Sequence, residues 1–312
     1  MFLNPKKKIA VLIPCYNEEK TIGSVIESFV NHIPESIVYA YDNASTDSTG
    51  EVAKNAGAIV RIEPNKGKGN VVRRMFADIE ADIYIIVDGD DTYESSQCPK
   101  MINQLIDDNL DMIVATRKAN NSDSAYRWGH VFGNWMLTNS VALIFGHGFT
   151  DMLSGYRVMS RRFVKSFPVM SKGFEIETEM TIHALQVGAS YKEVETVYDA
   201  RPEGSESKLS TFKDGFKILW MILILFKEEK PFQFFGLLSI FFFVLSITLS
   251  FPIFTTYLET GLVPRIPTAV LSMGLMILSF FSFVSGVIID SISRSKLESK
   301  RAKYMSYTSL NG

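Results

Sequence analysis

Two uncharged stretches near the end of the chain constrain its fold more than any other feature. No Asp, Glu, Lys or Arg occurs among the 26 residues from 232 to 257 or the 24 residues from 266 to 289. About 20 apolar residues in a helix cross a bilayer, so each stretch is long enough to span a membrane. The link between them, 258–265, is short. We therefore expect a two-helix transmembrane hairpin over 232–290.

The charges around this hairpin predict its orientation. The link carries only Glu259 and Arg265, whereas lysines and arginines flank the outer ends of both stretches. These flanking residues are Lys227, Lys230, Arg294, Lys296, Lys300, Arg301 and Lys303. Positive loops stay on the cytoplasmic side, so we expect both termini in the cytoplasm, with 291–312 as a basic cytoplasmic tail of a multi-pass inner-membrane protein.

The segment before the hairpin, 211–231, has apolar residues near helical spacing with lysines between them. This pattern predicts an amphipathic helix lying at the membrane interface. The alternative is a buried core helix, which has the same periodicity.

Residues 1–210 have the composition of an ordinary globular domain. Short apolar runs at 9–13, 37–41, 58–62, 83–87 and 112–116 alternate with segments of helical pattern. Strands that alternate with helices at this spacing predict an α/β domain with a mostly parallel, Rossmann-like sheet.

Charge and cysteine content exclude several classes of function. The net charge of −2 gives no basic footprint for a nucleic-acid partner. Cys15 and Cys98 are too few and too far apart for a disulfide framework or a zinc site, and the four histidines lack metal-ligand spacing. The sequence therefore directs attention to its acidic and basic loops.

The apolar run at 83–87 ends abruptly in Asp88, Gly89, Asp90 and Asp91. In open α/β sheets ligands bind at the carboxyl ends of strands, where these carboxylates would lie. Closely spaced carboxylates repel unless a cation compensates, and hard oxygen ligands favour Mg²⁺ or Mn²⁺. The alternative is a solvated acidic turn.

Other predicted strand ends carry groups suited to a nucleotide. Asp42 could accept hydrogen bonds from a base or ribose, and Lys68, between two glycines, could reach a phosphate. Taken alone, either residue fits an ordinary loop better than a binding site. Together with a membrane anchor, they indicate transfer from a nucleotide-activated donor to a membrane-bound acceptor. Asp151 is the candidate to orient that acceptor or take its proton.

The second half of the domain is rich in cations and less regular. Arginines at 117, 127, 157, 161 and 162, with Arg201 and Lys208, could bind a second anion, although the loop from 201 to 208 also fits an ordinary surface loop. The glutamates of 175–179 open a predicted helix, where acidic residues favour the helix dipole.

Five motifs in order resemble family 2 glycosyltransferases of the GT-A fold, and the resemblance covers about 8–230. These are Pro14-Cys15-Tyr16-Asn17-Glu18-Glu19, Asp42-Asn43-Ala44-Ser45-Thr46-Asp47, Gly67-Lys68-Gly69, Asp88-Gly89-Asp90, and the pair Ser154-Gly155-Tyr156-Arg157 and Arg201-Pro202-Glu203-Gly204-Ser205 with Lys208. The last pair is similar to the polyprenyl-phosphate branch, which includes dolichol-phosphate mannose synthases and GtrB-like undecaprenyl-phosphate glucosyltransferases. The two-span tail matches the GtrB-like layout.

The resemblance implies a role for each matching residue. Pro14, Tyr16, Glu18 and Asp42 would surround the base and ribose, with Lys68 and Asp88 near the ribose and diphosphate. Asp88 and Asp90 would hold Mg²⁺ or Mn²⁺. Asp151 matches a candidate catalytic aspartate of the family, so Asp151 and Asp90 are the expected catalytic residues. Arg117, Arg127, Arg201 and Lys208 would contact acceptor or donor phosphate. Thr92 departs from relatives that have a glutamine metal ligand there, so Asp91 or water would replace it.

The resemblance further implies inverting transfer of a sugar from a nucleotide-sugar, UDP-sugar favoured, to a polyprenyl phosphate such as undecaprenyl phosphate. Some GtrB-like relatives are tetramers, so a homo-oligomer is expected. One alternative is a polysaccharide synthase with another membrane acceptor, although the Gln-x-x-Arg-Trp motif of such enzymes is absent. The other is a membrane protein that binds nucleotide-sugars without turnover.

Overall fold

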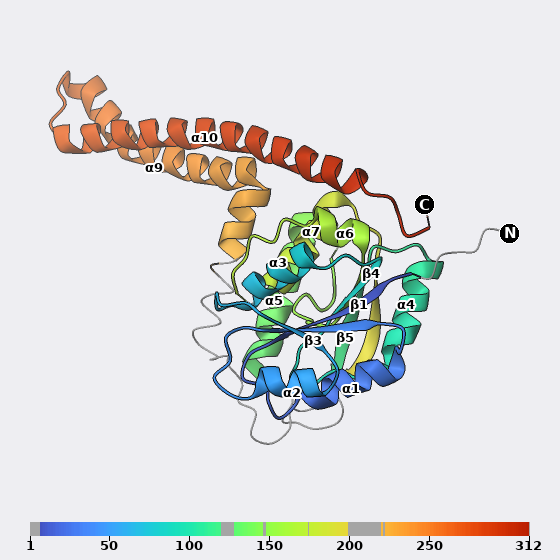
Figure 1. Cartoon of the computed structure of the whole chain (residues 1–312). Coiled ribbons are helices and arrows are strands. Elements are labelled where there is room, and N and C mark those ends of the chain that lie inside the picture. The colour runs from blue at the N-terminus through green and yellow to red at the C-terminus, as the bar shows by residue number, and fades with distance from the viewer. Residues whose placement is uncertain are drawn as a thin grey trace. The chain divides into compact units, whose positions relative to one another are not determined.

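A computed structural model describes residues 7–119, 128–145, 148–173, 175–198, 220 and 222–311 (Figure 1). The chain divides into two compact units. The first comprises Met1–Gly215 together with Lys300–Gly312, and the second is Phe216–Ser299. In the predicted interfacial segment 211–231, residues 211–219 and 221 lie outside the described residues, while 222–229 are helical.

The first unit is built on a seven-stranded sheet of order β3-β2-β1-β4-β6-β5-β7. The strands are β1 (Ile9–Cys15), β2 (Ile37–Asp42), β3 (Ile59–Ile62), β4 (Ile83–Ile86), β5 (Met112–Ala119), β6 (Arg157–Ser160) and β7 (Tyr191–Tyr198). β1 pairs in parallel with β2 and β4, β2 with β3, and β5 with β7. Only β6 runs antiparallel to its neighbours β4 and β5. The predicted mostly parallel sheet is confirmed, and β6 and β7 add to it.

Helices cover both faces of the sheet (Figure 1). The helices of this unit are α1 (Ile22–His32), α2 (Thr49–Asn55), α3 (Lys68–Asp78), α4 (Cys98–Asp107), α5 (Trp128–Phe145), α6 (Arg161–Ser166) and α7 (Ile176–Val187), with a 3₁₀ turn, η1 (Ser95–Gln97). α1, α2 and α4 pack on one face and α3, α6 and α7 on the other.

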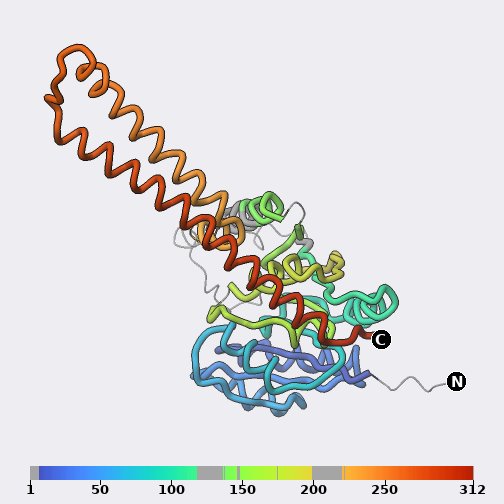
Figure 2. The backbone as a smooth tube through the Cα atoms, turned by 90° about the horizontal axis from the view of Figure 1, so that it is seen from above, coloured from blue at the N-terminus to red at the C-terminus, as the bar shows by residue number. Residues whose placement is uncertain are grey.

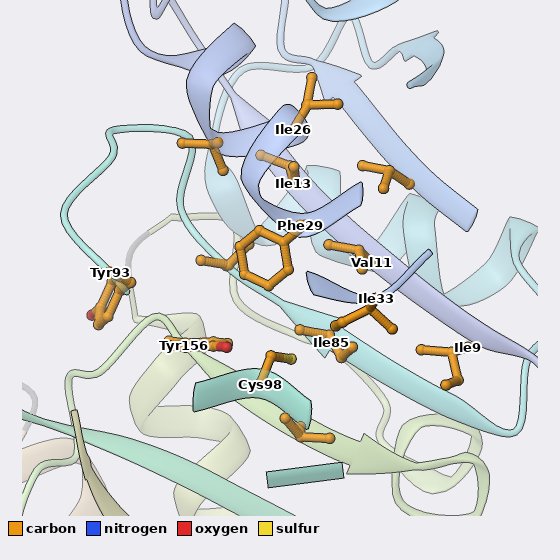
Figure 3. Close-up of a cluster of buried hydrophobic side chains, with 14 of the residues drawn as sticks. Ile9, Val11, Ile13, Ile26, Phe29, Ile33, Ile85, Tyr93, Cys98 and Tyr156 are labelled. Atoms are coloured by element: carbon orange, nitrogen blue, oxygen red, sulfur yellow. The ribbon is translucent and has the colours of Figure 1, made fainter. Parts of the chain in front are cut away.

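The core on the α1 face follows from the alternation of side chains along β1. Ile9, Val11 and Ile13 point toward α1, whose apolar residues recur at helical spacing (Figure 3). Phe29 of α1 contacts the ring of Tyr156 edge-on, with centroids 5.9 Å apart. Each such side chain contributes about 2 kcal/mol by leaving water. This packing fixes β1 beside β4 and so positions the loops that follow both strands.

The second unit contains two long apolar helices, α9 (Pro231–Thr260) and α10 (Ile266–Met305). By length and composition both could cross a membrane. They run side by side (Figure 2), and serines connect them. Ser246 donates to the Ser272 carbonyl at 2.7 Å, and Ser279 donates to the Ser239 carbonyl at 2.9 Å. Small polar residues between apolar helices let the backbones approach closely, as in membrane helix pairs.

The end of α10, from Lys300 on, belongs to the first unit. The Tyr304 hydroxyl donates to the Asp111 carboxylate, and its ring lies 4.6 Å from the Arg162 guanidinium. Lys300 Nζ donates to Gln186 Oε1 at 2.6 Å, and Arg301 Nε donates to the Gln186 carbonyl at 3.0 Å, near the end of α7. Residues 300–311 therefore complete this unit.

Asp111 immediately precedes β5 and is 1% exposed. It accepts hydrogen bonds from Arg162 Nε and Nη2 at 2.9 and 2.8 Å, from Ser160 Oγ at 2.9 Å and from Ser190 Oγ at 3.1 Å, besides Tyr304. Burial raises the pKa of Asp111, but Arg162 and Tyr304 outweigh it and hold the pKa below its ordinary value. We call these five residues the amino-edge cluster, because they lie where β5 and β7 begin.

Candidate active site

The loops after β1, β2 and β4 meet at the carboxyl edge of the sheet. The strand register aligns Cys15 with Asp42, and Leu12 with Ile86 two residues before Asp88. Pro14 is buried at the end of β1, and Asp42 accepts a hydrogen bond from the Ser45 amide at 2.9 Å. The residues predicted from strand ends are thus brought to one edge.

Hydrogen bonds from backbone amides to side-chain oxygens join the first two loops. Asn17, with a left-handed φ of 52°, donates from its amide to Ser45 Oγ at 3.0 Å and accepts from the Thr46 amide at 2.8 Å. The Glu18 amide donates to Thr49 Oγ1 at 2.8 Å. Tyr16 lies beside them, with the Lys66 ammonium 3.0 Å from its hydroxyl and 4.8 Å from its ring centroid.

Asn43, which was not among the predicted site residues, holds three loops together. Its amide nitrogen Nδ2 donates to the carbonyls of Glu63 and Asn65 at 2.9 and 2.8 Å. Its Oδ1 accepts from the Gly67 amide at 2.7 Å, and its backbone amide donates to the Cys15 carbonyl at 2.9 Å. The only sequence signal was its place directly after Asp42.

The loop Gly67-Lys68-Gly69 approaches another backbone closely. Gly67 has φ of 126°, and a Cβ there would overlap the Lys172 carbonyl. A Cβ at Gly69 would overlap the Ser171 carbonyl, while the Gly69 amide donates to Lys172 at 3.1 Å. Both glycines are therefore required by space, and they fix Lys68 at the start of α3. A cavity of about 460 Å³ opens beside this loop.

Lys68 binds two carboxylates. Its ammonium pairs with Asp88 and lies 2.5 Å from Glu177 Oε1 of α7. The side chains of Lys68 and Glu177 are 9% and 6% exposed, against 29% for Asp88. Burial lowers the pKa of Lys68, but Asp88 and Glu177 outweigh it and raise the pKa, whereas burial raises the pKa of Glu177. We call Lys68, Asp88 and Glu177 the carboxyl-edge cluster.

The other members of the acidic turn make separate contacts. Asp90 is 5% exposed and accepts from Thr92 Oγ1 at 2.6 Å. Asp91, with φ of 57°, accepts from Ser24 Oγ of α1 at 3.0 Å. Thr21 Oγ1 donates to the Gly89 carbonyl at 2.7 Å, which ties the turn to the start of α1.

The side chain of Glu18 and the backbone of Gly155 both contact this turn closely. A Cβ on Gly89 would lie 2.5 Å from Glu18 Oε2, and a Cβ on Gly155 would overlap the Asp88 carboxylate. The Gly155 amide donates to the Tyr93 hydroxyl at 2.9 Å. The Ser154-Gly155 segment therefore abuts the acidic turn, and only glycine leaves room for the Asp88 carboxylate.

The donor set of the turn fits a divalent cation. Asp88 and Asp90 supply hard carboxylate oxygens, and a side chain at position 155 would overlap the Asp88 carboxylate. Among the described residues no group of three or more His, Cys, Asp or Glu could hold a metal. Mg²⁺ commonly binds through one or two carboxylates plus substrate phosphates, so two aspartates suffice for a cation shared with a diphosphate.

Asp151 is held by Arg117. Arg117 donates from Nε and Nη2 to the two carboxylate oxygens at 2.7 and 2.8 Å, and its guanidinium lies 5.6 Å from the Tyr198 ring. The Asp151 amide donates to Glu193 at 3.2 Å. Burial raises the pKa of Asp151, but the Arg117 hydrogen bonds outweigh it and lower the pKa. Asp151 is thus an ionised, oriented carboxylate.

The other cations of the second half are distributed differently from the expectation. Arg127, Arg201 and Lys208 lie outside the described residues. Arg157 is fully buried, and Arg162 belongs to the amino-edge cluster. Arg161 donates to Glu80, whose carboxylate also pairs with Lys165. The expectation that 157, 161 and 162 bind a second anion is therefore wrong, because the Arg157 guanidinium is buried on protein carbonyls and Thr181, and Arg161 and Arg162 pair with Glu80 and Asp111.

Comparison with known proteins identifies the family. The profile of Glycosyl transferase family 2 matches residues 10–167. The chain belongs to glycosyltransferase family 2. Glycosyltransferase AglJ of Haloferax volcanii is 35% identical over 234 residues, 73% of this chain and 75% of that protein. The dolichyl-phosphate hexose transferase of the same organism is 26% identical over 222 residues, 71% of this chain and 95% of that protein.

The fold agrees with solved structures of other proteins. Glucosyl-3-phosphoglycerate synthase from Mycobacterium tuberculosis, in complex with Mn²⁺, UDP and glucosyl-3-phosphoglycerate, superposes with a TM-score of 0.56 at 22% identity, over 71% of this chain and 80% of that one. The GT-A fold expected from the motifs is confirmed. This family 2 member is a hexosyltransferase that uses a nucleotide-sugar donor.

Proposed function

We propose that the chain catalyses metal-dependent, inverting transfer of a sugar from a UDP-sugar to undecaprenyl phosphate or a similar polyprenyl phosphate, giving a polyprenyl-phosphate sugar. One observation carries the proposal. The acidic turn and Lys68 lie at the carboxyl edge of a domain whose chain continues into two helices long and apolar enough to cross a membrane. A donor site for a soluble nucleotide and an anchor in lipid suit a lipid acceptor.

The donor half of the site would use the acidic turn. Asp88 and Asp90 would hold Mg²⁺ or Mn²⁺, and Lys68 would meet the diphosphate. When bound, the cation neutralises charge on the leaving diphosphate. Pro14, Tyr16, Glu18 and Asp42 would surround the base and ribose. Support comes from the hydrogen bonds that join the loops after β1 and β2 into one wall.

The acceptor half would use the Asp151–Arg117 pair. A lipid phosphate is already an anion and a nucleophile, so it needs no strong general base. Asp151, with its lowered pKa, is a weak base but a rigid partner for Arg117. We infer that Asp151 orients Arg117 toward the lipid phosphate. Arg127, Arg201 and Lys208 would add positive charge to the acceptor site. The dolichyl-phosphate hexose transferase named above supports this acceptor class.

The parts of the chain would then be arranged around the membrane surface. Residues 1–210 would face the cytoplasm, where nucleotide-sugars are made, and 211–231 would lie at the interface. Residues 232–290 would span the membrane twice. Such an arrangement brings a phosphate headgroup and a soluble donor to the same edge of the sheet.

The test is transfer of a radiolabelled sugar in detergent or membranes. Purified full-length protein would be given undecaprenyl phosphate, Mn²⁺ or Mg²⁺ and each of a panel of labelled nucleotide-sugars. We expect a lipid-extractable product that requires the metal and disappears in Asp90→Asn. The control Asp108→Asn changes an exposed aspartate whose ion-pair partner among the described residues is Lys192, and it should leave transfer intact. Transfer by Asp90→Asn at the wild-type rate would overturn the assignment.

A further inference from the structure

The first turns of α7 contain three glutamates with different surroundings. Glu175 is exposed and caps no amide. Glu179 accepts from the amides of Met170 and Ser171, both at 2.8 Å, and so holds the loop that packs on Gly67 and Gly69. Glu177 is buried and pairs with Lys68. The sequence pattern alone treats all three as helix-start residues, but the contacts separate them.

We propose that Glu177 is a positioning residue of the donor site: it holds Lys68 so that Asp88 stays available to a divalent cation while the ammonium remains beside the diphosphate. This inference rests on the proposed function, because it assumes that the cation and the diphosphate meet at Asp88. Glu177 touches neither ligand in this role and acts through Lys68.

The charges of the carboxyl-edge cluster carry the argument. Lys68 contributes one positive charge and the two carboxylates contribute two negative charges, so these three residues together carry one excess negative charge beside the acidic turn. The buried Arg157 guanidinium also attracts Glu177, but its hydrogen bonds go to the carbonyls of Met152 and Ser154 and to Thr181. Without the Glu177 charge, Lys68 and Asp88 would form a closed neutral pair. A cation would then have to break that pair to reach Asp88. With Glu177, Lys68 retains a partner when Asp88 turns to another cation.

The backbone makes this arrangement rigid. Gly67 and Gly69 pack closely against Ser171 and Lys172, and the Gly69 amide donates to the Lys172 carbonyl at 3.1 Å, which holds the start of α3 in place. The Lys68 side chain is 9% exposed and so cannot exchange its partners freely with water. The Lys68 ammonium can therefore choose only between Asp88 and Glu177 as its partner within the carboxyl-edge cluster.

Glu177→Gln tests the proposal because it removes the charge and keeps the shape. The matched control is Glu51→Gln, which removes an exposed glutamate from the first turn of α2 and therefore reproduces any simple helix-dipole effect. Full-length proteins in detergent with saturating UDP would be titrated with Mn²⁺, and free Mn²⁺ followed by electron paramagnetic resonance. We expect about tenfold or more weaker Mn²⁺ binding in Glu177→Gln and less than about twofold change in Glu51→Gln. In transfer assays, KM for the donor should rise more than kcat falls.

A second pair of variants shows whether Glu177 acts through Lys68. In a Lys68→Met background, adding Glu177→Gln should not weaken Mn²⁺ binding further, because the residue through which Glu177 acts is already gone. This double variant also replaces the pair with two uncharged side chains, so it remains informative if Glu177→Gln alone unfolds. An equal loss from Glu177→Gln in both backgrounds would overturn the positioning role.

The wild-type titration separates this inference from the proposed function. If wild type binds Mn²⁺ with UDP and Glu177→Gln binds it equally well, the positioning role fails and the metal site stands. If wild type binds no Mn²⁺ in the presence of UDP, both proposals fall together.

Discussion

The two edges of the sheet each bury a cluster of opposite charges, but only one of them is saturated. In the amino-edge cluster a single carboxylate, Asp111, accepts from Arg162, Ser160, Ser190 and Tyr304. In the carboxyl-edge cluster a single ammonium, Lys68, is shared by Asp88 and Glu177. The first cluster has more donors than its carboxylate needs, and the second has fewer cations than carboxylates.

The difference separates an ion pair that supports the fold from one that can serve chemistry. Asp111 is already saturated and gains nothing from another cation, and the hydrogen bonds from Arg162 and Tyr304 hold its pKa below the ordinary value. A buried cluster with an excess carboxylate has an opposite consequence: burial raises the Glu177 pKa, and an incoming cation would be stabilised. We therefore expect substitutions at the two edges to affect different measurements.

The largest effect should come from Asp88→Asn at the carboxyl edge. Loss of a proposed metal ligand should lower kcat/KM by roughly a thousandfold, the scale of a removed electrostatic contact to a leaving group. Because Lys68 keeps Glu177 as a partner, the free energy of unfolding should change by less than about 1 kcal/mol. Steady-state transfer and chemical denaturation measure the two quantities. If Asp88→Asn loses stability but keeps full specific activity, then Asp88 supports the fold and is not part of the chemistry.

The next effect should come from Asp111→Asn at the amino edge. Removing one partner of a buried pair leaves Arg162 uncompensated and should lower the free energy of unfolding by about 3 kcal/mol. Specific activity per folded molecule should stay near wild type, because Asp111 lies away from the acidic turn. Denaturation curves and transfer by the folded fraction would show this. A tenfold fall in that specific activity would mean that the two edges are coupled.

Acid should lower the free energy of unfolding through His183, which lies near Lys300 and Lys303. His183 lies between Phe163 and Phe167, and burial, followed by Lys300 and Lys303, lowers its pKa to about 3. The folded state keeps His183 neutral, while the unfolded state binds a proton below about pH 6.5, so stability falls as pH falls. From pH 7.5 to 5.5 this one residue should remove about 1.4 kcal/mol.

The comparison for His183 is His183→Asn, which has no titration in this range. Unfolding free energies of both proteins would be measured at pH 7.5 and 5.5. The wild type should lose more than the variant by the amount given above. Parallel losses would show that His183 is protonated in the folded protein.

The smallest effect should come from Tyr304→Phe. The variant removes one hydrogen bond to Asp111 and leaves the Arg162 and serine bonds, so the free energy of unfolding should fall by about 1 kcal/mol. Thermal unfolding measures this loss of stability. The matched control is Tyr307→Phe, which removes a hydroxyl but keeps the ring that Arg161 contacts. Equal melting temperatures for all three proteins would mean that the tail does not rely on this bond.

The sequence predicted the strands and the residues that end them because both depend on local patterns. Asp42, Lys68 and Asp88 each follow an apolar run or stand between glycines, so their common edge followed from the parallel sheet. The GT-A fold followed from the order of the motifs. Roles within the site stay predictions where they depend on ligands.

What the sequence could not predict depends on contacts between distant segments. β6 begins with Arg157, whose charge suggested a phosphate site, yet its guanidinium is buried on the carbonyls of Met152 and Ser154 and on Thr181. Tyr304 and Asp111 are 193 residues apart, and no periodicity connects them. Glu177 differs from its neighbouring glutamates only by what lies opposite it in space.

The docked segment 300–311 also has a consequence for how the protein is made. A ribosome releases these residues only after both apolar helices have been synthesised. Until then Asp111 and Arg162 lack their contacts with Tyr304. The first unit therefore reaches its final form only after both long apolar helices have been synthesised, so completion of the catalytic part follows synthesis of the helices that could cross a membrane.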